Sequence, residues 1–67
     1  MIKLGSAILV TENLSNDSKY DFTIGKEGIV VNIDKSSTYP YQVRCDDFSN
    51  HIDSKALRFK EKELQLI

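Results

Sequence analysis

Cys45 and His51 are the side chains best suited to chemistry, because a thiol beside an imidazole can act as a nucleophile and both are zinc ligands. They are the single cysteine and the single histidine of the chain. A zinc site needs three or four ligands at a recognisable spacing, and no orienting group or oxyanion donor accompanies this pair. The neighbouring Asp46 and Asp47 would point in opposite directions at a strand end. We therefore expect no catalytic residue, no metal and no cofactor, and interpret Cys45 as a small core residue.

The segment GKEG, residues 25–28, raises the second chemical question, which is whether its two glycines hold a phosphate. A phosphate-binding P-loop has the pattern GxxxxGK followed by Ser or Thr, between a strand and a helix. Here an apolar strand pattern follows the glycines, and no βαβ unit surrounds them. We interpret Gly25 and Gly28 as structural residues that allow a positive φ or a close backbone approach where a loop enters a bent strand.

Size and charge restrict the classes of function. A chain of 67 residues forms one domain, residues 1–67, with no room for both a core and an enclosed active site, so we expect neither an enzyme nor a small-molecule substrate. The formal net charge of −1 gives no sign of a strongly basic surface. No apolar run approaches the length of about 20 residues that spans a membrane, and the N-terminus lacks the apolar centre of a signal peptide. These features predict no membrane partner, and a single cysteine, which cannot form an internal disulfide, favours a reducing cytoplasm.

The elements that must position these residues follow a period of two, which is typical of strands. Five short strands are predicted, over residues 6–12, 28–34, 39–45, 55–59 and 64–67. Ile8 and Val10 share one face of the first, and the inward face of the third holds Tyr39, Tyr41, Val43 and Cys45. Asn, Asp and Ser are dense in the connections, where they form local turns. These connections are a long first loop, a turn, a longer hairpin and a single helical turn, over residues 12–22, 34–40, 46–54 and 60–64. Five short strands avoid exposed edges by curling into a closed or nearly closed barrel, so the fold class is all-β.

The stretches FTIGKEGIVVNID, YPYQVRCDD and LRFKEKELQLI resemble the small SH3-like barrel proteins of bacteria and their phages. The resemblance covers residues 22–67 and implies a five-stranded barrel with a binding role and no chemistry. The glycine-to-strand opening also resembles KOW-type barrels, which contact nucleic acids. The hairpin 46–54 is longer than in the family, and Arg58 stands where an aromatic residue is common. The chain has no Trp and lacks the Ala-Leu-Tyr-Asp-Tyr segment of peptide-binding SH3 domains, so we expect no recognition of proline-rich peptides.

The first functional hypothesis is a protein-interaction module, a small accessory or host-directed factor of a phage or bacterium. It would bind a protein partner through its loops or through an open strand edge. Phe48, His51 and Ile52 stand among polar residues of the hairpin 46–54, as interface centres do. With them, Tyr20 and Arg58 complete the predicted partner-binding set. The alternative is that Phe48 and Ile52 belong to the core and cap one open end of the barrel.

The alternative hypothesis is a KOW-like nucleic-acid-binding domain. Its basic residues would be Lys55, Arg58, Lys60 and Lys62, acting with the aromatic ring of Tyr20. Acidic residues alternate with the last two lysines, and affinity for the phosphate backbone depends on the phosphates neutralised. The near-zero net charge therefore makes nucleic acid the second choice.

Overall fold

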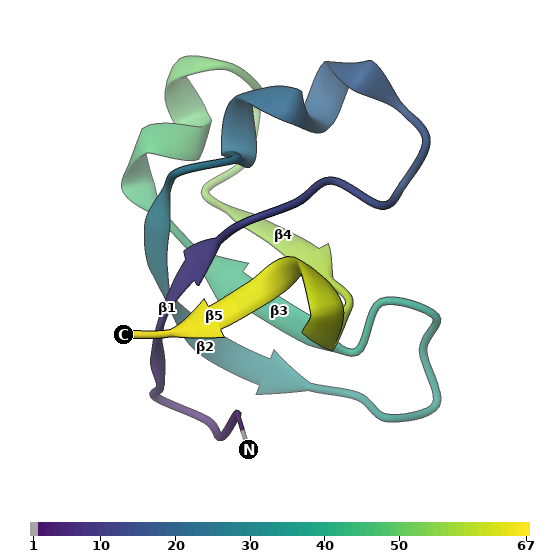
Figure 1. The fold of residues 1–67 in the computed structure, drawn as a ribbon. Coiled ribbons are helices and arrows are strands. Elements are labelled where there is room, and N and C mark those ends of the chain that lie inside the picture. The colour runs from purple at the N-terminus through teal and green to yellow at the C-terminus, as the bar shows by residue number, and fades with distance from the viewer. Residues whose placement is uncertain (1) are drawn as a thin grey trace.

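Five strands form where the sequence alternates between apolar and polar residues, and the computed structural model describes residues 2–67. The strands are β1 (Ala7–Val10), β2 (Glu27–Ile33), β3 (Tyr41–Arg44), β4 (Ala56–Phe59) and β5 (Leu64–Leu66). They form one antiparallel sheet in the order β4-β3-β2-β1-β5 (Figure 1). The prediction of an all-β fold with five short strands is therefore confirmed.

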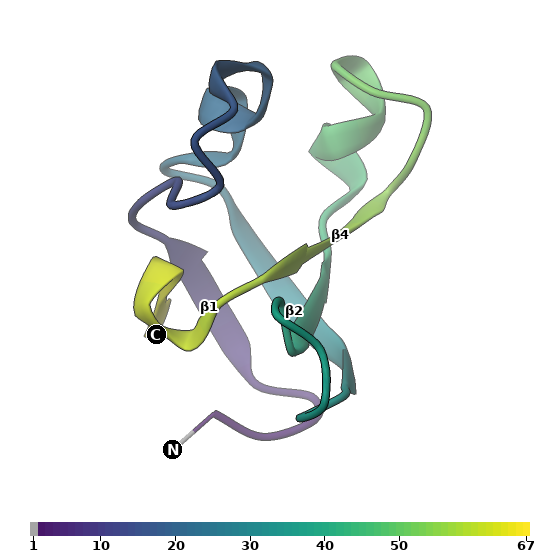
Figure 2. The same ribbon diagram turned by 90° about the vertical axis from the view of Figure 1, so that its right-hand side faces the viewer.

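Short 3-10 turns fill three of the connections. The turn η3 (Glu61–Glu63) lies directly before β5, where the sequence predicts a helical turn. The long first loop ends in η1 (Ser18–Thr23), and the hairpin after β3 begins with η2 (Asp46–Asn50), although the sequence indicates only irregular loops there. Figures 1 and 2 show η1 and η2 at the same end of the sheet. These two turns close that end over the core.

The core lies on the concave side of the sheet and takes one face of each strand. Ile8 and Val10 of β1 are buried, as are Tyr41 and Val43 of β3, which agrees with the predicted alternation. In β2 Val30 is buried, whereas its neighbours Ile29 and Val31 are exposed. The pairing of β2 with β3 shifts register between Val30 and Asn32. The remaining buried apolar residues are Ile2, Phe48, Phe59 and Leu64.

The sheet has two edges, because β4 pairs with β3 alone and β5 pairs with β1 alone. Within residues 2–67 no ladder joins β4 to β5, so the sheet does not close into a complete barrel. Figure 2 shows that the sheet is nevertheless strongly curved. An open edge on β4 follows from this arrangement.

The two glycines of the segment 25–28 have different structural roles. Gly25 has a φ of +89°, which suits glycine at the turn that leads into β2. The φ of Gly28 is not positive, so only the close-approach interpretation applies to it. A Cβ at Gly28 would lie 2.6 Å from the carbonyl oxygen of Arg44 and 2.7 Å from Cγ1 of Val43. Glycine is therefore needed at residue 28 because β3 crosses directly beside it.

Replacing Gly28 by alanine should lower the free energy of unfolding by about 1–3 kcal/mol, the usual cost of forcing extra volume into a packed site. The clash is with backbone, which cannot move without disturbing the pairing of β2 with β3. Urea denaturation of Gly28→Ala measures the effect. Glu27→Ala, at an exposed neighbour in the same strand, should change stability by no more than about 0.5 kcal/mol. Equal stabilities of the two variants would contradict the close approach.

Candidate functional site

A groove of about 390 Å³ lies between the first loop and β4, within the lower part of the range of about 300–1,000 Å³ seen for ligand pockets. One wall comes from the first loop and η1, and the other from β4 and the end of the 34–40 turn. Tyr20 of η1, Tyr39 at the end of the turn and Arg58 of β4 all line the groove. The other lining residues are Asn13, Ser15, Asp17, Leu57, Phe59 and Glu63.

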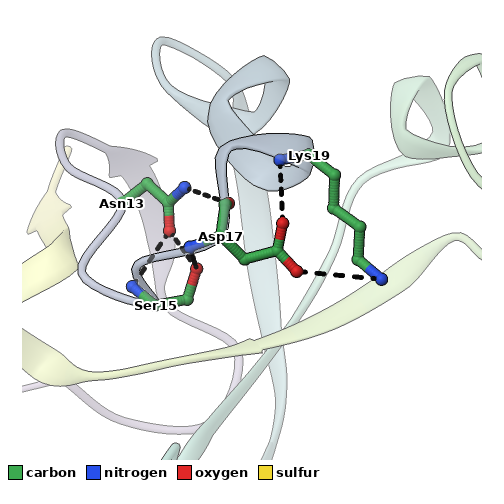
Figure 3. A network of polar contacts seen from close by, with 4 residues as sticks. All are labelled: Asn13, Ser15, Asp17 and Lys19. Atoms are coloured by element: carbon green, nitrogen blue, oxygen red, sulfur yellow. Dashed lines mark hydrogen bonds and ion pairs between the residues drawn. The ribbon is translucent and has the colours of Figure 1, made fainter.

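The wall formed by the first loop is held by its own polar side chains (Figure 3). Asn13 Nδ2 donates to the carbonyl oxygen of Asp17 at 2.9 Å, and Asn13 Oδ1 accepts from the Ser15 hydroxyl at 2.5 Å. Asp17 Oδ1 accepts from the backbone N–H of Lys19 at 3.1 Å and so caps η1. Asn13 Nδ2 also donates to Asp21 Oδ1 at 2.8 Å. The groove therefore has a preformed wall from which Tyr20 projects.

Arg58 fixes the opposite wall. Its Nε donates to the carbonyl oxygen of Tyr39 and its Nη2 to that of Pro40, both at 2.9 Å. Two longer contacts of 3.4 Å join the guanidinium to Asn32 Oδ1. All these acceptors are neutral oxygen atoms, and the guanidinium holds the turn in place. Hydrogen bonds within the same turn hold the pKa of the Asp34 carboxyl below its usual range, and the charge of the guanidinium is the smallest of the causes that shift it.

Glu63 lines the groove and connects the turn η3 to the first loop by hydrogen bonds. Its side chain is buried, and Oε1 accepts from the backbone N–H of Lys60 at 2.6 Å while Oε2 accepts from that of Leu14 at 2.9 Å. The Glu63 carbonyl oxygen accepts from the N–H of Thr11 at 2.8 Å. The sequence indicates only an acidic residue among lysines here. The feature that could have identified Glu63 is its position three residues after Lys60 in the turn before β5. From there a carboxylate can accept a hydrogen bond from the backbone N–H that begins the turn.

Positive charge is placed next to both tyrosine rings. Lys19 Nζ lies 5.1 Å from the centre of the Tyr20 ring, and Lys60 Nζ lies 5.3 Å from the centre of the Tyr39 ring. Both distances fall within the range of cation–π contacts. Arg58 and these two lysines place three cations at or beside the groove. Its two lining carboxylates are Asp17, which lies 3.9 Å from Lys19 Nζ, and Glu63, which keeps its negative charge while it accepts from two backbone N–H groups. The groove can thus hold a polar segment with aromatic stacking and negative charge.

The structure brings together only part of the residue set predicted from the sequence. Tyr20 and Arg58 share the groove, and the sequence misses Tyr39, which it assigns to the inward face of a strand. Phe48 is 0% exposed and contacts the core, so its assignment to a partner-binding surface is wrong. The ring is folded inward because η2 turns the chain back over the end of the sheet. Ile52 is half-buried against the same core.

His51 remains at the surface, outside the groove. Its ring stacks on Phe22 with centroids 4.4 Å apart, and Nε2 lies 3.9 Å from Oδ2 of Asp47. Lys26 Nζ approaches the same oxygen at 2.6 Å. This cluster joins η2 to the start of β2 and has a clear structural role.

Among the basic residues of the alternative set, Arg58 and Lys60 meet at Tyr39. Lys55 lies at the other end of β4, where its carbonyl oxygen accepts from the N–H of Cys45. Lys62 is exposed in η3, beside Glu61. The four residues therefore do not form one continuous surface with Tyr20.

The Lys26–Asp47 pair predicts a pH dependence of stability. The hydrogen bond from Lys26, followed by that from Asn50, holds the pKa of Asp47 below its usual range. Because the folded carboxyl binds its proton less tightly than the unfolded one, the pair contributes fully above pH about 4 and is lost as the pH falls through the lower folded pKa. Asp47→Asn should therefore destabilise at pH 6 and much less at pH 2.5.

Urea midpoints of the wild type and Asp47→Asn at the two pH values measure this difference. Asp53→Asn, in the same hairpin and exposed, is the matched control and should follow the wild type. A destabilisation by Asp47→Asn that stays constant from pH 6 to pH 2.5 would contradict the role of the ion pair.

A second hollow of about 360 Å³ is lined by residues of β1, β2 and β3 and by the end of the chain. It includes Gly28, Cys45 and Ile67. The Cys45 thiol is free and half-buried there. Across residues 2–67, no three His, Cys, Asp or Glu side chains gather closely enough to hold a metal ion. Within the same range, no helix has the length and apolar character needed to cross a bilayer.

Comparison of the chain with protein-family models, with curated proteins and with solved structures found no match in any of the three.

Proposed function

We propose that this chain is a non-catalytic protein-interaction module that binds a segment of a partner protein in the groove between the first loop and β4. The observation that carries the proposal is the convergence of Tyr20, Tyr39 and Arg58, from three separate segments, on one preformed groove. Tyrosine and arginine are the residue types enriched where binding energy concentrates in protein interfaces. The Arg58 side chain is already fixed by hydrogen bonds, so it loses little conformational freedom on binding.

We also propose that the domain is an SH3-like barrel and that the protein works as an accessory factor in the cytoplasm. The strand order β4-β3-β2-β1-β5, the long first loop and the 3-10 turn before β5 support a barrel of the SH3-like type. The resemblance of residues 22–67 to small bacterial and phage barrels supports an accessory or host-directed factor that works in the cytoplasm. The lack of Trp in the sequence makes the groove different from an aromatic groove for proline-rich peptides.

Nucleic acid is the second candidate, and a specific observation favours it. Two aromatic rings, each with a lysine beside it, resemble the combination of stacking surfaces and cations that binds single strands. The net charge of −1 and the separation of Lys55 from the groove favour protein. Non-specific nucleic-acid binders have dissociation constants of about 10⁻⁴–10⁻⁶ M at physiological salt, which sets the scale for a test.

Capture of partners by the tagged protein from its native cell, with and without nuclease, separates the two candidates. Nuclease-resistant retention of a protein by the wild type, and its loss in Tyr39→Ala, is the expected result. Ile67→Ala, at an exposed residue outside the groove, should capture normally. Retention that disappears on nuclease treatment would favour nucleic acid, and equal capture by wild type and Tyr39→Ala would remove the groove from the binding surface.

A further inference from the structure

The free edge of β4 faces the groove, and its hydrogen-bonding pattern follows from the ladder to β3. The N–H of Cys45 donates to the carbonyl oxygen of Lys55 at 2.8 Å, so these two residues form a hydrogen-bonded pair. In an antiparallel ladder the pairs alternate, so Leu57 and Phe59 also direct their backbone groups toward β3. The intervening residues of the strand, Ala56 and Arg58, therefore direct their N–H and C=O groups toward the free edge, as does Lys60 beyond it.

Two of these three outward positions are already occupied. The Ser54 hydroxyl accepts from the Ala56 N–H at 3.1 Å and donates to the Ala56 carbonyl oxygen at 2.9 Å. At Lys60, the N–H donates to Glu63 Oε1 and the carbonyl oxygen accepts from the Glu63 N–H at 3.0 Å. Arg58 lies between them, and its N–H and C=O bond to no group within residues 2–67. One unpaired donor–acceptor position thus remains on this edge, at the middle of the groove.

We propose that the partner segment binds in an extended conformation and adds to the β4 edge, exchanging two backbone hydrogen bonds with Arg58. The proposal rests on the proposed function and names the class of its ligand. Addition of a strand to an open sheet edge uses backbone groups for affinity and side chains for specificity. Because Ala56 and Lys60 are covered, the segment pairs at one residue only, and the tyrosines on either side hold its flanks.

The charge around this position specifies the residue that pairs with Arg58. Side chains of directly opposed residues lie on the same face of a sheet, so the paired residue places its side chain next to the Arg58 guanidinium. The oxygen atoms that accept from this guanidinium are all neutral. The pKa of the Asp34 carboxyl is lowered mainly by hydrogen bonds within its turn, and its Coulomb interaction with the guanidinium is the smallest of the causes. Lys60 lies beside the Tyr39 ring, and Lys19, which is paired with Asp17, lies beside the Tyr20 ring. An Asp or Glu at the paired position complements these charges. The ligand is therefore an extended protein segment with a central acidic residue.

Selection of a displayed library of random dodecapeptides on the intact protein provides the probe. Enrichment of peptides with a central Asp or Glu, lost on Tyr39→Ala, is expected. A synthetic selected peptide is then methylated at one backbone nitrogen at a time. Methylation at the paired residue should weaken binding about tenfold, because it removes the N–H that donates to the Arg58 carbonyl oxygen. Methylation of the adjacent residues, whose N–H groups point away from β4, should have little effect.

Hydrogen exchange of the Arg58 amide gives a readout independent of affinity. In the free protein this amide should exchange quickly while those of Leu57 and Phe59 are protected, and the selected peptide should protect it. Arg58→Pro lacks the N–H at an edge position that tolerates proline, whereas Arg58→Ala keeps it. We expect the proline variant to bind the peptide several-fold more weakly than the alanine variant, with both folded by circular dichroism.

The outcomes separate the two proposals. Peptides that shift the signals of Tyr20 and Tyr39 but leave the Arg58 amide unprotected, with no sensitive position in the methylation scan, would overturn strand addition and keep the groove as a binding site. A library without enrichment, or peptides that bind without involving the tyrosines, would overturn the proposed function and strand addition together.

Discussion

Replacing Phe48 by alanine should lower the free energy of unfolding by about 3–5 kcal/mol, the range for removing a buried phenylalanine ring. The ring is 0% exposed and makes an edge-to-face contact with Phe22 at 5.9 Å and a tilted contact with Phe59 at 6.2 Å. A domain of this size has a total stability of only about 3–10 kcal/mol, so this single change removes much of it. Urea or thermal denaturation followed by circular dichroism measures the loss.

A second variant keeps the prediction testable if Phe48→Ala does not fold. Phe48→Leu retains most of the apolar contact and should be folded but less stable than the wild type. Leu4→Ala, at an exposed apolar residue, should stay within about 0.5 kcal/mol of the wild type. A Phe48→Ala protein as stable as the wild type would show that the ring is not part of the core.

Replacing Glu63 by alanine should cost about 3 kcal/mol or more. Hydrogen bonds to a charged group contribute about 1.5–3 kcal/mol each, and this carboxylate accepts two from backbone N–H groups. Glu63→Gln keeps the shape but turns an NH₂ group toward one of the two donors, so it should recover only part of the loss. Denaturant midpoints measure both variants.

Amide exchange at Leu14 distinguishes this role from a general loss of packing. Its N–H should lose protection in Glu63→Ala, because its acceptor is the side chain itself. Glu61→Ala, at the exposed acidic residue of the same turn, should leave Leu14 protected and stability nearly unchanged. Unchanged Leu14 protection in Glu63→Ala would contradict the hydrogen bond that joins the turn to the first loop.

Local patterns in the sequence were enough to predict the strands and their inward faces. Ile8, Val10, Tyr41 and Val43 alternate with residues that face away from the core, and this period of two is a property of neighbouring residues. Gly25 is predictable in the same way, because a turn into a strand often requires a positive φ. The open edge of β4 was not predictable, since it depends on whether two distant strands meet.

The candidate site was predicted only in part, because its contacts join residues far apart in the sequence. Tyr20 and Arg58 were identified as aromatic and basic residues, but their meeting in one groove depends on the curvature of the sheet. Phe48 was misplaced because a 3-10 turn folds a polar-looking loop back onto the core. Glu63 resembles any surface acid until its backbone partners at Leu14 and Lys60 are seen.

Site-specific photo-crosslinking tests the central claim, that the groove is the binding surface, most directly. Benzoylphenylalanine replaces Tyr39 in one variant and Ile67, which is 67% exposed outside the groove, in another. Irradiation in the native cell should join the residue-39 variant to a partner protein at a segment with a central acidic residue, and should leave the residue-67 variant free. An adduct from residue 67 alone, or a nucleic-acid adduct from residue 39, would contradict the proposed protein-binding groove.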